Sequence, residues 1–290
     1  MIRVERLSKS FRGARVLDGL DLAIASGERV ALVGANGAGK TTLIRCLLGE
    51  YICQGSVAVG GLEPRARRTE VLRRVGFVPQ LPPPLRMPVG GLLGFAADVC
   101  GGATAPMEEV AARLGLDPRS VWRHPFAKLS GGQQQKLLIA VALGRGCELL
   151  LLDEPAANLD PRARRSFFEL LAEWQGSATM LISSHRIDEV ASLVSRVIEL
   201  DQGRVVLDDR VDGAAALDAL LLCVVELARP SEAAAAALRS WGLAPAGGEL
   251  RFEGSIAGPE RLRFLGVLSR YAGLLRALSL VEARGAERRR

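Results

Sequence analysis

Short runs of β-branched residues or leucine alternate with longer segments of helical periodicity over residues 2–207. This alternation predicts a mixed α/β domain with a largely parallel core sheet. The clearest predicted strands are continuous apolar runs, and they span residues 29–33, 75–78, 149–152 and 179–182. The run Leu81-Pro82-Pro83-Pro84 can neither continue a strand nor enter a helix. Helical patterns follow it, so we expect a helical insertion over about residues 81–146.

The pattern changes after residue 207. The predicted elements there are strands over residues 220–227, 249–253 and 274–282 and helices over residues 231–241 and 259–271. We therefore expect two domains, residues 1–212 and a small α+β extension over residues 213–290. Regulation, additional dimer contacts and packing alone all remain open as roles of this extension.

The composition narrows the class of protein. The 290 residues are 49% hydrophobic and 24% charged, which is typical of a soluble globular protein and not of a fibrous or disordered chain. No stretch reaches the roughly 18 apolar residues of a membrane-spanning helix, and the N-terminus lacks an apolar signal core. We therefore expect a cytosolic protein.

The five cysteines never have CxxC spacing, which argues against a disulfide framework and a thiolate metal site.

A glycine-rich segment directly follows the strand at residues 29–33 and precedes helical sequence. Its residues match the phosphate-binding loop pattern, and they are Gly34, Ala35, Asn36, Gly37, Ala38, Gly39, Lys40, Thr41 and Thr42. Glycines allow backbone N–H groups to curl around an anion, and the following helix points its positive end at the same place. We expect Lys40 to reach the β- and γ-phosphates of a nucleotide and the Thr41 hydroxyl to bind Mg²⁺.

Two acids end a second apolar run. The leucines at residues 149–152 suit a strand buried on both faces, and Asp153, Glu154 and Pro155 follow them. Because side chains alternate along a strand, the two carboxylates should point to opposite sides. One can then help to hold Mg²⁺ while the other faces the γ-phosphate and an attacking water.

A second glycine-containing helix start lies further along the chain. Ser130, Gly131, Gly132 and Gln133 precede a helical run, and they offer a hydroxyl, backbone amides and the helix dipole to an anion. On its own this segment is more often a simple helix N-cap than an anion site.

Together these motifs closely resemble those of the ATP-binding subunits of ABC transporters, over about residues 2–207. The glycine-rich loop is similar to Walker A, residues 129–133 to the signature motif and residues 149–154 to Walker B. Phe77-Val78-Pro79-Gln80 resembles the Q-loop, Asn158-Leu159-Asp160 the D-loop, and Ser183-Ser184-His185 the switch histidine. Six motifs in the right order are far more specific than any one of them. The implied fold is a P-loop ABC ATPase core with a helical subdomain.

The resemblance also implies roles for single residues. Gln80 would contact Mg²⁺ and the attacking water, and His185 would touch the γ-phosphate. Phe11 matches the aromatic residue that stacks on adenine, although an ordinary core phenylalanine remains an alternative. Asp160 of the D-loop would lie at the nucleotide site. The implied cofactors are ATP and Mg²⁺.

The partners follow from the same resemblance. Two cassettes would pack head to tail, as a homodimer or with a second ATPase subunit, so that Ser130 and Gly131 of one complete the ATP site at Lys40 of the other. ATP would close the dimer, and separate membrane-spanning permease subunits would couple closure to transport at the inner face of the membrane. The C-terminal extension gives a weak preference for export. The alternatives are an ABC ATPase that acts on nucleic acid or a cell-envelope complex, and a module that only binds ATP. We expect no nucleic-acid partner.

Overall fold

The computed structural model describes residues 1–174, 178–184, 190, 193–210, 220–257, 261–269 and 271–282. Contacts divide the chain into two compact units. Unit 1 comprises Met1–His185 and Leu193–Asp209, and unit 2 comprises Arg186–Ser192 and Arg210–Arg290. The division near residue 210 lies close to the domain boundary that the sequence pattern predicts at residue 212.

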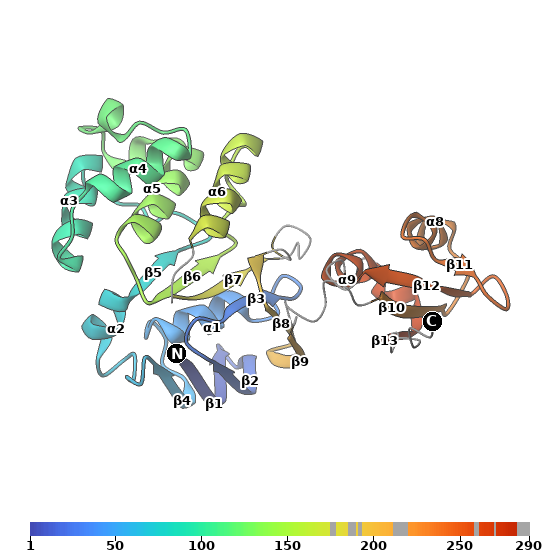
Figure 1. Cartoon of the computed structure of the whole chain (residues 1–290). Coiled ribbons are helices and arrows are strands. Elements are labelled where there is room, and N and C mark those ends of the chain that lie inside the picture. Colours follow the sequence, from blue (N-terminus) through green and yellow to red (C-terminus); the bar gives the residue numbers. More distant parts are fainter. Residues whose placement is uncertain are drawn as a thin grey trace, which may run out of the picture. The chain divides into compact units, whose positions relative to one another are not determined.

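A six-stranded sheet forms the centre of unit 1, in the order β5-β6-β7-β3-β8-β9 (Figure 1). Its strands are β5 (Val75–Val78), β6 (Leu149–Asp153), β7 (Thr179–Ser183), β3 (Arg29–Val33), β8 (Arg196–Asp201) and β9 (Arg204–Arg210). All pairs from β5 to β8 are parallel. The four strands predicted from apolar runs are therefore neighbours, and their carboxyl ends meet at one edge.

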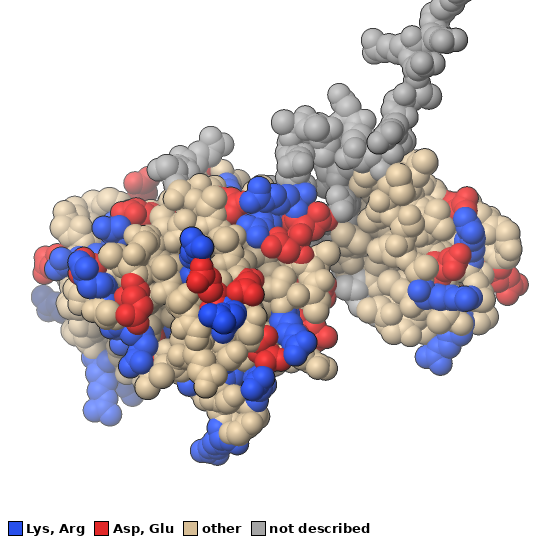
Figure 2. Space-filling model, turned by 90° about the horizontal axis from the view of Figure 1, so that it is seen from below, with Lys and Arg blue, Asp and Glu red and all other residues tan. Residues whose placement is uncertain are grey.

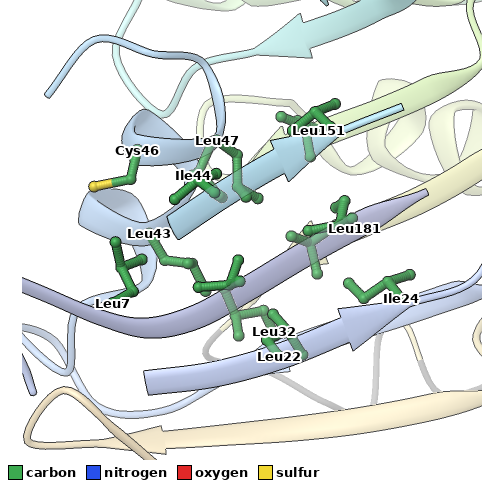
Figure 3. Close-up of a cluster of buried hydrophobic side chains, with 14 of the residues drawn as sticks. Leu7, Leu22, Ile24, Leu32, Leu43, Ile44, Cys46, Leu47, Leu151 and Leu181 are labelled. Carbon is green, nitrogen blue, oxygen red and sulfur yellow. The ribbon is translucent and has the colours of Figure 1, made fainter. Parts of the chain in front are cut away.

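A second, antiparallel sheet faces the first across a shared core. It consists of β1 (Ile2–Phe11), β2 (Ala14–Ile24) and β4 (Gln54–Val59), in the order β2-β1-β4. Helix α1 (Lys40–Leu47) buries Leu43, Ile44 and Leu47 against side chains from both sheets (Figure 3). Each buried leucine contributes about 1.5–3 kcal/mol of hydrophobic free energy, so the helix that follows the glycine-rich loop is firmly anchored.

The segment between β5 and β6 is helical, as the helical patterns after the proline run predict. It contains α3 (Val89–Cys100), α4 (Ala105–Arg113), α5 (Gly131–Gly144) and the 3₁₀ helices η1 (Pro118–Val121) and η2 (Phe126–Lys128). A separate hydrophobic cluster, which includes Leu93, Phe126 and Leu137, holds these helices together. The remaining helices of unit 1 are α2 (Arg68–Arg74) and α6 (Pro161–Glu173).

Unit 2 has a βαββαβ order. Its elements are β10 (Leu220–Leu227), α8 (Glu232–Ser240), β11 (Ala244–Pro245), β12 (Arg251–Ala257), α9 (Arg261–Ser269), η5 (Ala272–Leu274) and β13 (Leu275–Glu282). The strand order β11-β12-β10-β13, with all pairs antiparallel, is that of a ferredoxin-like fold. Val225, Phe252 and Phe264 lie in its own core. The sequence pattern missed β11, which is two residues long and includes Pro245.

The structure thus has the predicted mixed α/β core with a C-terminal α+β appendage. Within the part of the chain that the structure describes, no helix is long and apolar enough to cross a membrane.

Candidate functional site

Glycine conformation shapes the loop between β3 and α1. Gly34 has φ +145°, and a Cβ there would lie 2.3 Å from the Leu200 carbonyl oxygen. Gly39 has φ +110° and serves as the N-cap of α1. A Cβ at Gly39 would meet Leu17 at 2.8 Å and the Val16 carbonyl oxygen at 3.0 Å. Only glycine fits both positions without strain, so the loop packs its backbone directly against neighbouring strands.

Lys40 is the first residue of α1 and its side chain is buried, with 7% exposed. Its Nζ donates to the carbonyl oxygens of Gly34 (2.6 Å) and Ala35 (3.2 Å) and lies 3.9 Å from Glu154 Oε1. Burial lowers the pKa of Lys40 below its ordinary value, and the charges of Glu154 and Asp153 oppose this shift. The ammonium group therefore lies inside the loop, where it can exchange carbonyl oxygens for phosphate oxygens.

The two acids lie at the end of β6, with Asp153 as its last residue and Glu154 in the turn that follows. Asp153 is 2% exposed, and its Oδ1 accepts a hydrogen bond from Ser183 Oγ at 2.7 Å. Ser183 lies opposite Asp153 on the neighbouring strand β7, and its Oγ also accepts the Glu154 N–H at 2.9 Å. Glu154 itself has φ +46°, a left-handed conformation that is costly for a residue with a Cβ. Ser183 thus supports both acids at once.

The loop, Gln80 and Glu154 enclose a cavity of about 380 Å³. Most of the predicted nucleotide-binding residues line it, namely Ala35, Asn36, Gly37, Ala38, Gly39, Lys40, Thr41 and Thr42. Gln80 comes from the segment after β5. The structure therefore brings the glycine-rich loop, Gln80 and Glu154 together around one cavity, although they lie far apart in the sequence. The volume lies in the range of small-molecule sites. Backbone amides, one ammonium group and one carboxylate give this cavity the chemistry to hold an anionic ligand beside a general base.

The second glycine-containing helix start forms a complete capping box. Ser130 is the N-cap of α5, and its Oγ accepts the Gln133 N–H at 3.3 Å. Gln133 Oε1 in turn accepts the Ser130 N–H at 3.0 Å. Ser130, Gly131, Gly132 and Gln133 do not line the cavity formed by the described residues of this chain.

Phe11 lies at the end of β1 and is 38% exposed. Its ring meets that of Tyr51 edge to face, with centroids 5.1 Å apart, and the Lys9 Nζ lies 4.6 Å from the Phe11 centroid. Phe11 is not a core phenylalanine, but it is also absent from the lining of the cavity among the described residues. The residue of this region that does line the cavity is Val16, on β2.

The two remaining predicted site residues are Asp160 and His185. Asp160 is the N-cap of α6, where its Oδ1 accepts the Ala163 N–H at 2.9 Å and its Oδ2 pairs with Lys136 Nζ at 2.9 Å. The hydrogen bond from Ala163, followed by that from Lys136, holds the pKa of Asp160 below its usual value. His185 lies outside the described residues.

Sequence reasoning missed Val16 and Ser183. Ser183 carried a usable signal, because it follows the predicted strand at residues 179–182 and adjacent parallel strands end at the same edge of the sheet. Val16 carried none, since an apolar residue in a strand predicts a core position first.

Comparisons with known proteins agree with this geometry. Residues 17–157 match the family described as ABC transporter. The chain is 37% identical over 237 residues to the phosphonates import ATP-binding protein PhnC of Stutzerimonas stutzeri, covering 71% of this chain and 83% of that protein. It is also 35% identical to the Nod factor export ATP-binding protein I of Paraburkholderia xenovorans (strain LB400), covering 70% of this chain and 68% of that protein. Several other relatives at this level of similarity are named for import.

A solved structure described as an ATP-binding subunit of an ABC transporter superposes with a TM-score of 0.66. It is 26% identical, and the match covers 73% of this chain and 90% of that one. With six ordered motifs, a phosphate-ready cavity and relatives above 30% identity over most of their length, this chain belongs to the ABC transporter family as an ATP-binding subunit that hydrolyses ATP.

Proposed function

We propose that ATP binding at the cavity closes a head-to-tail dimer of cassettes, and that hydrolysis reopens it and drives transport through separate membrane subunits. The observation that carries this proposal is the meeting of Lys40, Gln80 and Glu154 around one cavity. Lys40 would bind the β- and γ-phosphates, and Glu154 would polarise a water for in-line attack on the γ-phosphate. The two states differ in their contacts to the γ-phosphate, and this difference supplies the free energy for closure.

The donor set suits Mg²⁺. Thr41 and Gln80 both line the cavity, and Asp153 is a buried carboxylate at the end of β6. Hydroxyl, amide and carboxylate oxygens are the ligands that this hard cation prefers. We therefore assign Thr41, Gln80 and Asp153 to the ion, which when bound would neutralise charge on the phosphates. Ser183 would keep Asp153 oriented through the hydrogen bond from its hydroxyl.

The second helix start supports the dimer. Amides and a hydroxyl are offered to an anion by Ser130, Gly131, Gly132 and Gln133. These residues do not line the cavity that the described part of their own chain forms. We assign them to the γ-phosphate held by the partner copy. His185 would touch the γ-phosphate and Asp160 would lie at the nucleotide site, as the motifs imply. A solved structure of similar fold is described as a dimeric cassette bound to ADP and Pi.

Exposed apolar side chains support a membrane partner. Leu81, directly after Gln80, is 76% exposed, and Phe95 on α3 is 59% exposed. Val99 lies one turn after Phe95 on the same face of the helix and is also exposed. We propose that these residues contact the permease subunits at the inner face of the membrane, so that movements at Gln80 reach them. The preference for export gains no support from relatives that are mostly named for import, and we do not carry it forward.

One pair of variants tests the assignment of Glu154. Glu154→Gln keeps size and hydrogen-bonding capacity but cannot accept a proton, so we expect phosphate release by the full-length chain to fall at least about hundredfold. Binding of Mg·ATP should persist, and the ATP-bound dimer should accumulate on size-exclusion chromatography. Glu148→Gln, an exposed acid just before the start of the same strand, is the matched control and should keep wild-type turnover. Normal phosphate release by Glu154→Gln would remove this residue from the mechanism.

A cassette that acts on nucleic acid is the second candidate. Such a protein usually presents a continuous basic surface. On the face seen in Figure 2, basic and acidic side chains are interspersed. Ion pairs also join basic and acidic side chains of unit 1, such as Arg204 with Asp18 and Arg67 with Glu70. This pattern favours the transport proposal. Co-purification from detergent-solubilised membranes distinguishes the two, since an integral membrane protein should accompany the chain only if it serves transport.

A further inference from the structure

Gln135 lies in α5, two residues after the capping box, and its side chain is completely buried. A buried amide is costly unless its polar atoms are hydrogen-bonded. The Gln135 Nε2 donates to the Pro155 carbonyl oxygen at 2.9 Å and to the Pro79 carbonyl oxygen at 3.4 Å. One NH₂ group therefore joins α5 to two other segments of the chain.

The chemistry of these partners fixes the orientation of the amide. Pro79 and Pro155 have no backbone N–H, so each can only accept a hydrogen bond. The nitrogen of Gln135 must therefore face them and the oxygen must face away. Gln135 Oε1 finds no hydrogen-bond partner among the residues that the structure describes. The side chain is thus held in place by donation alone.

The two carbonyl groups both belong to residues that adjoin a predicted catalytic residue. Pro79 directly precedes Gln80, and Pro155 directly follows Glu154. Strands β5 and β6 are parallel neighbours, so these residues follow strand ends that lie side by side. Asn158 Nδ2 adds a second connection by donating to the Gln80 carbonyl oxygen at 3.4 Å. The segments that carry Gln80 and Glu154 are therefore joined through side-chain amides as well as through the sheet.

The turn at Glu154 needs such support. Its left-handed backbone conformation is unfavourable, so without restraint the turn would relax and displace the carboxylate. Ser183 Oγ restrains the turn on one side by accepting the Glu154 N–H. Gln135 restrains it on the other side through Pro155, whose ring leaves little freedom between the restraint and Glu154.

We propose that Gln135 is a positioning residue: it holds the backbone beside Gln80 and Glu154 in place and ties both to the helix that begins at Ser130. A movement of the start of α5 would then be passed to the water-activating carboxylate. This inference rests on the roles proposed for Glu154 and Gln80. Gln135 does not line the cavity of the described residues, so it should affect the chemical step and not the affinity for nucleotide.

Gln134 provides a matched control. It is the preceding residue of the same helix, and its Nε2 also donates to two carbonyl oxygens, those of Phe126 (3.2 Å) and Leu129 (3.0 Å). Both partners belong to the helical insertion. Gln134→Met therefore removes the same number of hydrogen bonds from the same helix without touching the segments of Gln80 and Glu154.

The experiment measures steady-state Mg·ATP hydrolysis by the full-length chain and its Gln135→Met and Gln134→Met variants. We expect Gln135→Met to lower kcat about tenfold, with KM within about twofold of wild type. Gln134→Met should keep at least about half of the wild-type kcat. Equal kcat values for the two variants, or a rise in KM that accounts for the loss, would overturn the inference.

A second variant covers failure of Gln135→Met to fold. Gln135→Asn keeps an amide but is one methylene shorter, so its nitrogen cannot reach both carbonyl oxygens from the same backbone position. It should lower kcat by a similar factor while thermal unfolding and nucleotide titration show a folded, ATP-binding chain. A kcat of Gln135→Asn within twofold of wild type contradicts the inference. Absence of hydrolysis by the wild-type chain itself would instead contradict the proposed function, so the two failures are distinguishable.

Discussion

Two helices of unit 1 begin at glycine-containing segments whose backbone amides could bind an anion, but the two helix starts differ in their N-cap hydrogen bonds. The start of α1 has Gly39 as its N-cap, with no side-chain cap hydrogen bond among the described residues. The start of α5 has a full capping box between Ser130 and Gln133. The amides of α1 are thus available to a ligand, whereas two of the donors of α5 are already satisfied by its own side chains.

This difference indicates an order of events. The loop before α1 can bind nucleotide by itself, because its amides and Lys40 surround a cavity within one chain. The start of α5 gains nothing from an anion until the ligand replaces the internal bonds of the capping box. Under the proposed function, such a start would act only when a partner copy presents a bound γ-phosphate. The start of α1 should therefore affect nucleotide affinity within one chain, whereas the start of α5 should affect turnover only.

The largest expected effect is at the first site. Lys40→Ala removes a buried ammonium group from the cavity lining, so we expect the affinity for Mg·ATP to fall about hundredfold, or about 2.7 kcal/mol. Isothermal titration with the full-length chain measures this change. Lys128→Ala, an exposed lysine in η2, is the control and should bind as wild type. An unchanged titration for Lys40→Ala would contradict the assignment of the cavity.

Alanine substitution of one glycine at each helix start tests whether the backbone there requires glycine. Gly39→Ala forces a left-handed residue with a Cβ against Leu17 and Val16, and we expect a loss of about 2 kcal/mol in the free energy of unfolding. Gly131 has no neighbour within 4 Å of an added Cβ among the described residues, so Gly131→Ala should stay within about 0.5 kcal/mol of wild type. Urea denaturation measures both. Equal losses would mean that the loop before α1 is not strained as the structure indicates.

Loss of the capping serine tests the conditional site. Ser130→Ala removes an N-cap, which costs about 1 kcal/mol of stability, and we expect turnover to fall about tenfold with the affinity for ATP unchanged. Ser231 caps α8 in unit 2 in the same way, through the Ala234 N–H. Ser231→Ala should cost similar stability and leave turnover as in wild type. A tenfold loss of turnover in both variants would show that the effect comes from stability alone.

Much of the fold could be predicted from the sequence because its signals are local. Continuous apolar runs predicted strands β3, β5, β6 and β7, and the proline run after Gln80 predicted the excursion into helices. The element that escaped, β11, is too short to show an alternating pattern and contains Pro245, which normally argues against a strand. The second sheet of unit 1 also escaped, because nothing in the pattern of β1, β2 and β4 says which strands share a sheet.

The candidate site divides in the same way. Lys40 and Glu154 were predicted from residue type and spacing, and both line the cavity. Residues whose contacts depend on the rest of the fold are harder to predict. The fold places the Ser183 hydroxyl beside Asp153 and the Gln135 amide beside Pro155. Of the two, Ser183 had a signal in the sequence, because it follows a predicted parallel strand, whereas the spacing along the chain does not encode the contacts of Gln135. Phe11 shows the converse, since its motif predicts a place at the nucleotide while its ring packs against Tyr51.

The smallest expected effect on stability concerns the start of a third helix, α6, where the N-cap residue carries a negative charge. Asp160 caps the helix and pairs with Lys136 of α5, and these hydrogen bonds lower its pKa below the ordinary value of 3.8. A carboxyl group with a lowered pKa in the folded state adds stability above its unfolded pKa, and this stability is lost as the pH falls through the folded pKa. Asp160→Asn keeps a good N-cap but loses the charge. Urea midpoints should therefore show wild type slightly more stable than Asp160→Asn at pH 6, with the gap narrowing below about pH 4. A gap that persists unchanged at pH 2.5 would mean that the side chain acts at α6 by its geometry alone.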